Sequence, residues 1–245
     1  MMKKITEIDV QPMCDEIDNN LWEPTGGMVG HGRNWVGTEI QTLIRHKTLF
    51  SARRSEYYPC DFETPLDDLC LPDYCPTNTL SMYPEAIDTL VWFATTYGGK
   101  YARAMYYRTP PDTTVGIHLD AQPDSFNVGV MNNGVLSGKN GFYYKKDRYH
   151  VVIDGSYEYT VDHELEDKIY ELPLNKTFQT WPGEFMTLPV TKTFSKGDVW
   201  WFNNKRPHTS YNNGDIPKIN LVFDIDRSGR DEQSSFAERI DHDYP

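Results

Sequence analysis

The stretch that most constrains the fold is 216–226, where apolar and polar residues alternate. The apolar set is Ile219, Leu221, Phe223 and Ile225, and the polar set, interrupted by Val222, is Lys218, Asn220, Asp224 and Asp226. Successive side chains of a β-strand point to opposite faces, so this pattern predicts a strand with one buried apolar face. If the polar face lines the interior of a barrel, Lys218 points inward, where a buried amine needs an anionic partner.

Other short segments rich in aromatic and β-branched residues follow one another closely, with turn signals between them. These segments are 101–108, 114–120, 126–131, 142–145, 149–153, 157–161, 177–181, 184–188, 194–202 and 208–211. Asp154-Gly155 and Pro182-Gly183 are expected to close hairpins. Many short strands at this spacing predict a β-sandwich or a barrel.

The N-terminal part contains one clear helix signal. Pro84–Tyr97 has apolar residues at helical spacing, a proline in its first turn and two glycines after its end, which predicts a helix packed on the outside of a sheet. Residues 1–8 fit an edge strand, and 37–50 fit either a strand or a helix. The glycine-rich segment 23–37 fits a surface loop or a lid over an active site.

Two segments supply residue types that bind iron. Residues 114–120 alternate like a strand, which would place His118 and Asp120 on one face. His208 follows an aromatic, β-favouring run and a turn. Two histidines and one carboxylate form a facial triad that leaves coordination positions open and suits non-haem Fe(II) oxygenases. By itself, the His-x-Asp pair equally fits a surface histidine beside an aspartate, because the chain is rich in acidic residues.

The order of these motifs resembles that of the 2-oxoglutarate/Fe(II)-dependent dioxygenases. Residues 107–120 (YRTPPDTTVGIHLD) and 196–227 (KGDVWWFNNKRPHTSYNNGDIPKINLVFDIDR) look most like the aspartyl/asparaginyl β-hydroxylase-like branch. In that branch a turn precedes the first histidine, and a basic residue and an apolar strand follow the second. The resemblance covers roughly residues 100–227, with an unmatched middle.

The resemblance implies a mainly β chain, with a double-stranded β-helix (jelly-roll, cupin-like) core and a few flanking helices. It also implies that His118, Asp120 and His208 are the catalytic residues that bind Fe(II), and that Lys218 binds the distal carboxylate of the cosubstrate 2-oxoglutarate. The branch usually has arginine where this chain has Lys218. A lysine binds the carboxylate as a point charge, without the two-pronged geometry of a guanidinium group.

Two further residues are assigned to the cosubstrate by the same resemblance. Tyr107 stands where the branch places a small hydroxyl residue near 2-oxoglutarate. Asn127 stands where the branch has an Arg-x-His pair, so it can donate a hydrogen bond but carries no charge. The implied reaction is hydroxylation of a C–H bond, with succinate and carbon dioxide as coproducts.

All 245 residues are expected to form one domain. In this interpretation, 1–99 is an N-terminal support region with a helix, 100–227 is the double-stranded β-helix core, and 228–245 is a tail. Inserted hairpins are expected at about 134–190, at the mouth of the barrel. Such extensions often contact substrate, since function concentrates on loops held by a rigid scaffold.

Composition excludes some classes of partner. The net charge of −12 argues against a general nucleic-acid-binding protein, because phosphate neutralisation needs clustered lysine and arginine. No run of about 18 apolar residues suggests a membrane span. The first residues lack the apolar segment of a secretory signal. The four cysteines form no Cys-x-x-Cys pair, and the expectation is a cytoplasmic protein with free thiols, although a Cys60–Cys75 or Cys70–Cys75 bridge is an alternative.

The sequence leaves the substrate and two rival classes open. The branch resemblance favours an Asp, Asn or Pro side chain of a peptide, and a small molecule fits nearly as well. One rival is a non-catalytic jelly-roll binding or structural protein. The other is a cupin-type metalloprotein that is not an oxygenase. The oligomeric state is not indicated by the sequence.

Overall fold

The computed structural model of the protein describes residues 2–17, 23–24, 39–47, 59–118, 146–162, 188–202 and 208–226. Its helices are α1 (Gln11–Ile17) and α2 (Pro84–Tyr97), with 3₁₀ turns at Asp67–Leu69 and Asn78–Met82. The strands are β1 (Met2–Glu7), β2 (Glu23–Pro24), β3 (Glu39–His46), β4 (Tyr74–Pro76), β5 (Lys100–Thr109), β6 (Thr113–His118), β7 (Lys146–Asp154), β8 (Tyr157–Asp162), β9 (Pro189–Phe194), β10 (Asp198–Phe202), β11 (His208–Asn212) and β12 (Lys218–Asp226). Within these ranges no helix is long and apolar enough to cross a membrane.

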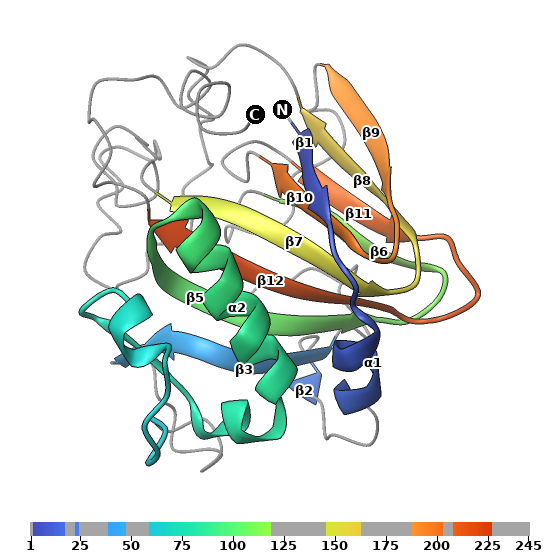
Figure 1. The fold of residues 1–245 in the computed structure, drawn as a ribbon. Coiled ribbons are helices and arrows are strands. Elements are labelled where there is room, and N and C mark those ends of the chain that lie inside the picture. The colour runs from blue at the N-terminus through green and yellow to red at the C-terminus, as the bar shows by residue number, and fades with distance from the viewer. Residues whose placement is uncertain are drawn as a thin grey trace, which may run out of the picture.

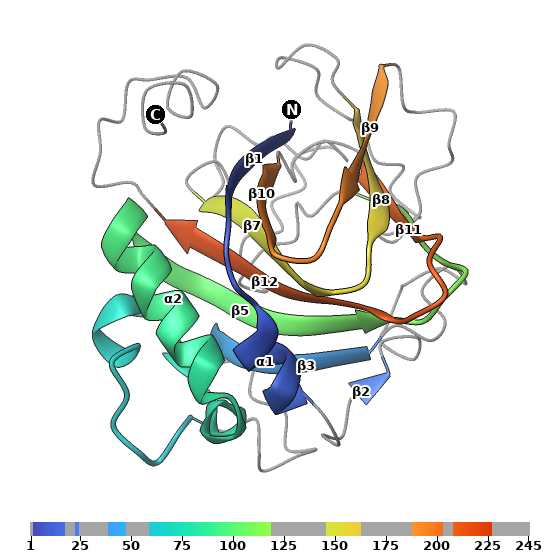
Figure 2. The same ribbon diagram turned by 45° about the vertical axis from the view of Figure 1, so that its right-hand side comes forward.

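The strands form two antiparallel sheets. The larger has the order β1-β10-β7-β12-β5-β3-β2, with β4 paired to β3, and the smaller has the order β6-β11-β8-β9. Figures 1 and 2 show α1 and α2 on one side of the larger sheet and the smaller sheet on its other side. The 1–8 segment is the predicted edge strand, and the ambiguous 37–50 segment contributes β3.

The connections between strands define a double-stranded β-helix, as predicted. The pairs β5/β6, β7/β8, β9/β10 and β11/β12 are consecutive in the chain, yet the two members of each pair lie in different sheets. Asp154-Gly155 is therefore a turn between sheets, and the predicted hairpin was wrong. Gly155 has φ +76°, and a Cβ there would lie 3.1 Å from the Lys218 Cα, so glycine is needed both for the turn and for the close approach.

The prediction of inserted hairpins at about 134–190 was wrong for 146–162. These residues form β7 and β8, which have neighbours on both sides in the larger and the smaller sheet. The long spacing between the two histidine motifs had suggested an insertion, whereas half of the double-stranded β-helix is encoded there. The segments 134–145 and 163–187, the proposed lid and the tail at 228–245 lie largely or wholly outside the described residues.

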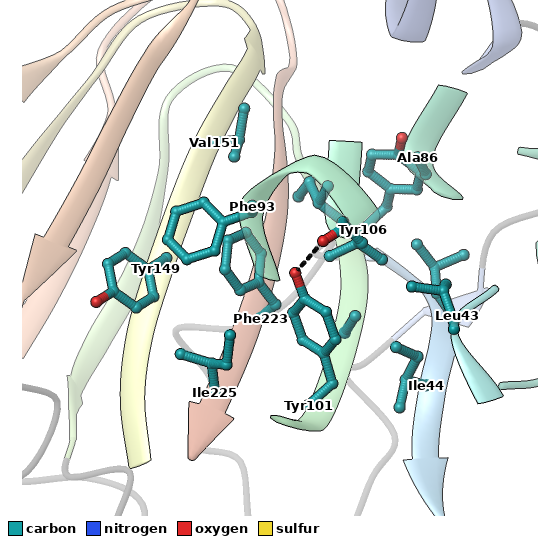
Figure 3. Close-up of a cluster of buried hydrophobic side chains, with 14 of the residues drawn as sticks. Leu43, Ile44, Ala86, Phe93, Tyr101, Tyr106, Tyr149, Val151, Phe223 and Ile225 are labelled. Carbon is teal, nitrogen blue, oxygen red and sulfur yellow. Dashed lines mark hydrogen bonds between the residues drawn. The ribbon is translucent and has the colours of Figure 1, made fainter. Parts of the chain in front are cut away.

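The principal core lies between the larger sheet and α2. Phe93 of α2 packs against Tyr149 and Phe223, with ring centroids 4.7 Å apart in both pairs (Figure 3). The buried Tyr101 hydroxyl donates a 2.6 Å hydrogen bond to the Leu90 carbonyl, so its polar end is satisfied inside this core. The helix predicted at Pro84–Tyr97 has the predicted bounds, and Gly98 ends it at φ +77°.

At one end of the barrel the chain crosses from one sheet to the other, and hydrogen bonds hold these crossings together. Asn212 lies at the end of β11 and is fully buried. Its Nδ2 lies 3.0 Å from the carbonyl oxygens of Thr109, Pro110 and Ile216, and its Oδ1 accepts from the Gly214 N–H. One side chain thus ties the β5–β6 and β11–β12 connections together. His118 and His208 lie at the opposite ends of their strands.

Candidate active site

Lys218 is the most unusual charged residue of the barrel interior. It begins β12, only 3% of its surface is exposed, and its Nζ donates a 2.7 Å hydrogen bond to the Ser210 hydroxyl. The ammonium also lies over the Tyr157 ring, 4.1 Å from its centroid. Burial lowers the pKa of Lys218 to about 7. None of its hydrogen bonds or ion pairs with the described residues involves a carboxylate, so an anionic ligand would offset the cost of burying the amine.

Ser210 connects this lysine to the predicted iron ligand His208. The two residues are two positions apart on β11, so their side chains share a face of the strand. His208 is fully buried, and its ring stacks on Tyr159 with centroids 5.8 Å apart and planes at 19°. The predicted cosubstrate anchor and one predicted iron ligand therefore lie next to each other in the barrel.

The backbone brings the two predicted histidine ligands together. In the antiparallel pairing of β6 and β11, His118 is directly opposite His208, although 89 other residues separate them in sequence. The register shifts by one residue between this pair and the Ser210–Val115 pair. A β-bulge of this kind redirects neighbouring side chains and is common beside active sites.

The remaining predicted site residues are only partly described. Tyr107 lies on β5, opposite Asn220 of β12, and burial raises the pKa of its phenol. Asp120, Asn127 and the side chain of His118 lie outside the described residues. In the described part of the chain no three His, Cys, Asp or Glu residues form a metal-binding group. The described backbone is compatible with a ferrous-iron site, because it pairs the positions of two histidines, the residue type that supplies the nitrogen ligands of a facial triad.

Sequence reasoning missed the residues that surround Lys218. His150 of β7 lies 3.3 Å from the Tyr157 hydroxyl through its Nδ1. Burial, and secondarily the charge of Lys218, hold the pKa of His150 well below its usual value, so its ring is neutral near pH 7. The alternation of 149–153 could have placed His150 on one face of a strand. Only the pairing of the sheets shows that this face is the interior.

Aromatic rings fill much of the space around these polar groups. Phe194 stacks on Trp200 with centroids 4.5 Å apart and on Tyr159 with centroids 5.2 Å apart. Together with Val152, Tyr157 and Val161, these residues form a second buried cluster on the inner side of the sheets. Buried rings of this kind lower the local dielectric, which strengthens electrostatic interactions between the polar groups beside them.

Further along β12, the inner face carries a shared ion pair. Asp224 accepts hydrogen bonds of 2.7 and 2.8 Å from Arg148 of β7. Arg103 of β5 donates to the same carboxylate at 3.2 Å, from the other side. The three residues lie in one row across β7, β12 and β5, six residues along β12 from Lys218. The row forms a polar boundary at the far end of the inner face.

No protein-family model and no curated protein sequence matches this chain. Among solved structures, a 2OG-Fe(II) oxygenase family oxidoreductase from Burkholderia pseudomallei is similar over 89% of this chain and 77% of its own, with 12% identity and a TM-score of 0.47. A protein with a double-stranded β-helix domain from Klebsiella pneumoniae covers 51% and 66%, with 11% identity and a TM-score of 0.29.

E. coli ycfD is similar over 57% of this chain at 16% identity, with a TM-score of 0.32. The match spans 28% of the ycfD chain, and the match to an oxalate decarboxylase from Lactobacillus farciminis spans 30% of that chain. This chain thus corresponds to under a third of each of these two proteins. At such identities, its function has to be inferred from its own residues.

Proposed function

We propose that this chain is an Fe(II)- and 2-oxoglutarate-dependent dioxygenase that hydroxylates a C–H bond. One observation carries the proposal: a buried lysine that has no carboxylate partner among the described residues bonds to Ser210, on the same strand face as His208, and the backbone of His118 is paired with His208. Two residues of a strand span roughly 6.6–6.8 Å. A five-carbon dicarboxylate has a suitable length to reach from a metal at the histidines to the ammonium group.

The residues divide the work as follows. His118, Asp120 and His208 would hold the iron, and Lys218 and Ser210 would bind the distal carboxylate of 2-oxoglutarate. When bound, the metal and cosubstrate would supply oxidation by O2, in which one oxygen atom ends in succinate, formed from 2-oxoglutarate with release of carbon dioxide, and the other ends in the hydroxylated substrate. The stacked ring of Tyr159 limits rotation of the His208 imidazole, and a fixed imidazole orientation is what a metal ligand requires.

The surrounding residues keep the anion and exclude water. Lys218 has a pKa of about 7 because it is buried, and a carboxylate beside it would favour its charged form. The inner aromatic cluster shields this ion pair from solvent. The proposed substrate is an Asp, Asn or Pro side chain of a peptide, or a small molecule that presents a similar C–H bond.

The test is an anaerobic titration of the metal-free protein with Fe(II), with and without 2-oxoglutarate. A visible metal-to-ligand charge-transfer band is expected only when both are present, followed by succinate release in air. His118→Ala should abolish the band. Lys218→Ala should weaken the affinity for 2-oxoglutarate about 10- to 100-fold, because a hydrogen bond to a charged group contributes roughly 1.5–3 kcal/mol.

Lys192→Ala is the matched control, because Lys192 is an exposed lysine on β9 of the smaller sheet. It should leave both the band and the affinity unchanged. Folded protein that binds iron but gives no band with 2-oxoglutarate would reject the oxygenase. The non-catalytic jelly-roll protein and the non-oxygenase cupin-type metalloprotein would then be the better explanations.

A further inference from the structure

A row of polar side chains runs behind Lys218, across three strands. His150 of β7 is within hydrogen-bonding distance of the Tyr157 hydroxyl of β8. The Tyr157 hydroxyl also interacts with the side-chain amide of Asn220 on β12. The Tyr157 ring, in turn, lies beneath the Lys218 ammonium. The Tyr157 hydroxyl therefore contacts both His150 and Asn220, and the Tyr157 ring contacts Lys218.

The amide of Asn220 is incompletely satisfied in this arrangement. Asn220 is 2% exposed, and its Oδ1 has no hydrogen-bond partner among the described residues. A buried acceptor without a donor costs roughly 1–3 kcal/mol. Lys218 is two positions away on the same strand face, and its ammonium also lacks a carboxylate. Within the described part of the chain, the Asn220 Oδ1, which lacks a donor, and the Lys218 ammonium, which lacks a carboxylate, thus belong to neighbouring residues of one strand face.

The orientation of the amide decides what it offers to a ligand. With Nδ2 towards Tyr157, Oδ1 faces a ligand and repels an anion. Half a turn about the terminal bond exchanges the two atoms, and Oδ1 then accepts from the Tyr157 hydroxyl. An N–H of Asn220 then becomes available beside the ammonium. Since one phenol has only one proton, this orientation requires that His150 donate to the Tyr157 oxygen.

His150 can meet that requirement. Its ring is neutral, so it carries one N–H, which resides on either Nδ1 or Nε2. With the proton on Nδ1, each contact in the row has one donor and one acceptor. Ser210 completes the set, because its oxygen accepts from Lys218 and leaves its hydroxyl proton for the ligand. Three donors then surround one position: an ammonium, a hydroxyl and an amide N–H.

We propose that His150 and Tyr157 are positioning residues for a carboxylate site made by Lys218, Ser210 and Asn220. His150, in its Nδ1–H tautomer, donates to Tyr157. Tyr157 donates to the Asn220 Oδ1 and so fixes the amide with its N–H towards the anion. The site takes an ionised carboxylate of an aliphatic dicarboxylate and discriminates against an uncharged amide. The identification of this group as the distal carboxylate of 2-oxoglutarate rests on the proposed function.

The first test measures binding of succinate to the metal-free full-length protein by calorimetry. Tyr157→Phe keeps the ring beneath Lys218 but deletes the hydroxyl, and it should raise the Kd about tenfold, the effect of losing roughly 1.4 kcal/mol. His150→Leu should act similarly. His150→Asn keeps an N–H close to the position of Nδ1 and should restore most of the affinity. Unchanged affinity in Tyr157→Phe would overturn the proposal.

Tyr101→Phe is the matched control, since it deletes a buried, hydrogen-bonded hydroxyl of the outer core. It should lower stability without changing the Kd. A second readout is the tautomer of His150, from ¹⁵N chemical shifts of the succinate complex. Protonated Nδ1 is expected, and protonated Nε2 with bare Nδ1 would overturn the proposal even if a substituted protein failed to fold.

The two proposals fail differently. Succinate binding that depends on Tyr157, in a protein that gives no charge-transfer band with iron and 2-oxoglutarate, would reject the oxygenase and keep the carboxylate site. A normal band whose 2-oxoglutarate dependence is unaffected by Tyr157→Phe and His150→Leu would keep the oxygenase and reject the positioning row.

Discussion

The two faces of the larger sheet are built from the same strands but have different roles. On the outer face of β12, Leu221 and Phe223 join the apolar core under α2. On the inner face, Lys218 and Asn220 meet polar groups from the smaller sheet. The alternation of a strand therefore separates the groups that stabilise the protein from those that can bind a ligand, at a spacing of one residue.

The outer and inner faces of the larger sheet differ in how much their buried side chains contribute to stability. Burying an aromatic side chain such as Phe223 is favourable when it packs well against its neighbours. Burying Lys218 or Asn220 is unfavourable unless each polar atom finds a partner. A face that retains such residues is suited to bind a ligand, because a ligand can provide the polar partners that the described residues do not. Removing an outer-face ring and removing the Lys218 amine should therefore have opposite effects on stability.

The largest effect is expected on the outer face. Phe223→Ala removes a ring that contacts Phe93, Tyr101 and Tyr149, and it should lower the free energy of unfolding by about 3–5 kcal/mol. Urea unfolding followed by far-UV circular dichroism measures this loss. At temperatures where the variant is folded, its affinity for succinate should equal that of the parent. A loss below about 1 kcal/mol would contradict the assignment of the core.

The inner ion pair should give the next largest effect. Asp224→Asn keeps the shape but removes the negative charge shared by Arg148 and Arg103. We expect a loss of about 2–4 kcal/mol, below the upper range for buried pairs because the Arg103 side chain is 34% exposed. Adding Arg148→Met to this variant should recover part of the loss in the same unfolding measurement. Further loss in the double variant would show that Arg148 stabilises the fold without Asp224.

Lys218 should show the reverse sign on stability. Its folded-state pKa of about 7 lies below the usual value of 10.5, so between these values the unfolded chain binds more protons. Lys218 therefore makes unfolding easier below pH 7, and this cost disappears as the pH rises towards 10.5. Lys218→Met should be more stable than the parent at pH 6.5, and its advantage should shrink by at most about 1.4 kcal/mol per pH unit up to pH 9.

Thermal and urea unfolding of both proteins across this pH range test the sign. Groups that do not interact with Lys218 titrate equally in the two proteins. His150, whose pKa is lowered mainly by burial, is neutral in both above pH 7, so the difference between the proteins in that range isolates Lys218. A parent protein that is more stable than Lys218→Met at pH 6.5, in the absence of any carboxylate, would mean that the ammonium is already compensated by the chain.

The smallest effect is expected from a residue that points away from the interior. Glu158 lies between Tyr157 and Tyr159 on β8 and is more exposed than either. Glu158→Gln should change the free energy of unfolding by about 0.5 kcal/mol or less. Succinate affinity should also be unchanged, in contrast to Tyr157→Phe next to it. A tenfold loss of affinity would show that the two faces of β8 are not separated in function.

Local patterns predicted those features that depend on neighbours in sequence. The helix Pro84–Tyr97 was predicted with its observed bounds, since its start and stop signals lie within it or beside it. The two faces of β12 followed from alternation. The turn at Gly155 was predicted as well, although not that it joins two sheets, because glycine readily adopts the positive φ of 76° that the turn needs.

Part of the candidate site was also indicated by sequence, and part was not. His208 and Lys218 stood out through motif order, and the structure places them near each other through Ser210. Ser210, His150 and Tyr157 gave no comparable signal. Each is an ordinary residue of an alternating strand, and its importance comes from facing a group on another strand.

By itself the sequence determined which residues of each strand share a face, where α2 begins and ends, and where the chain turns. Only the tertiary structure decided that β7 and β8 belong to different sheets, that His118 lies opposite His208, and that His150 reaches Tyr157. The physical reason is the range of the interactions. Backbone angles and side-chain periodicity are set within a few residues, whereas strand pairing joins segments far apart in the chain and is chosen by the packing of the whole barrel.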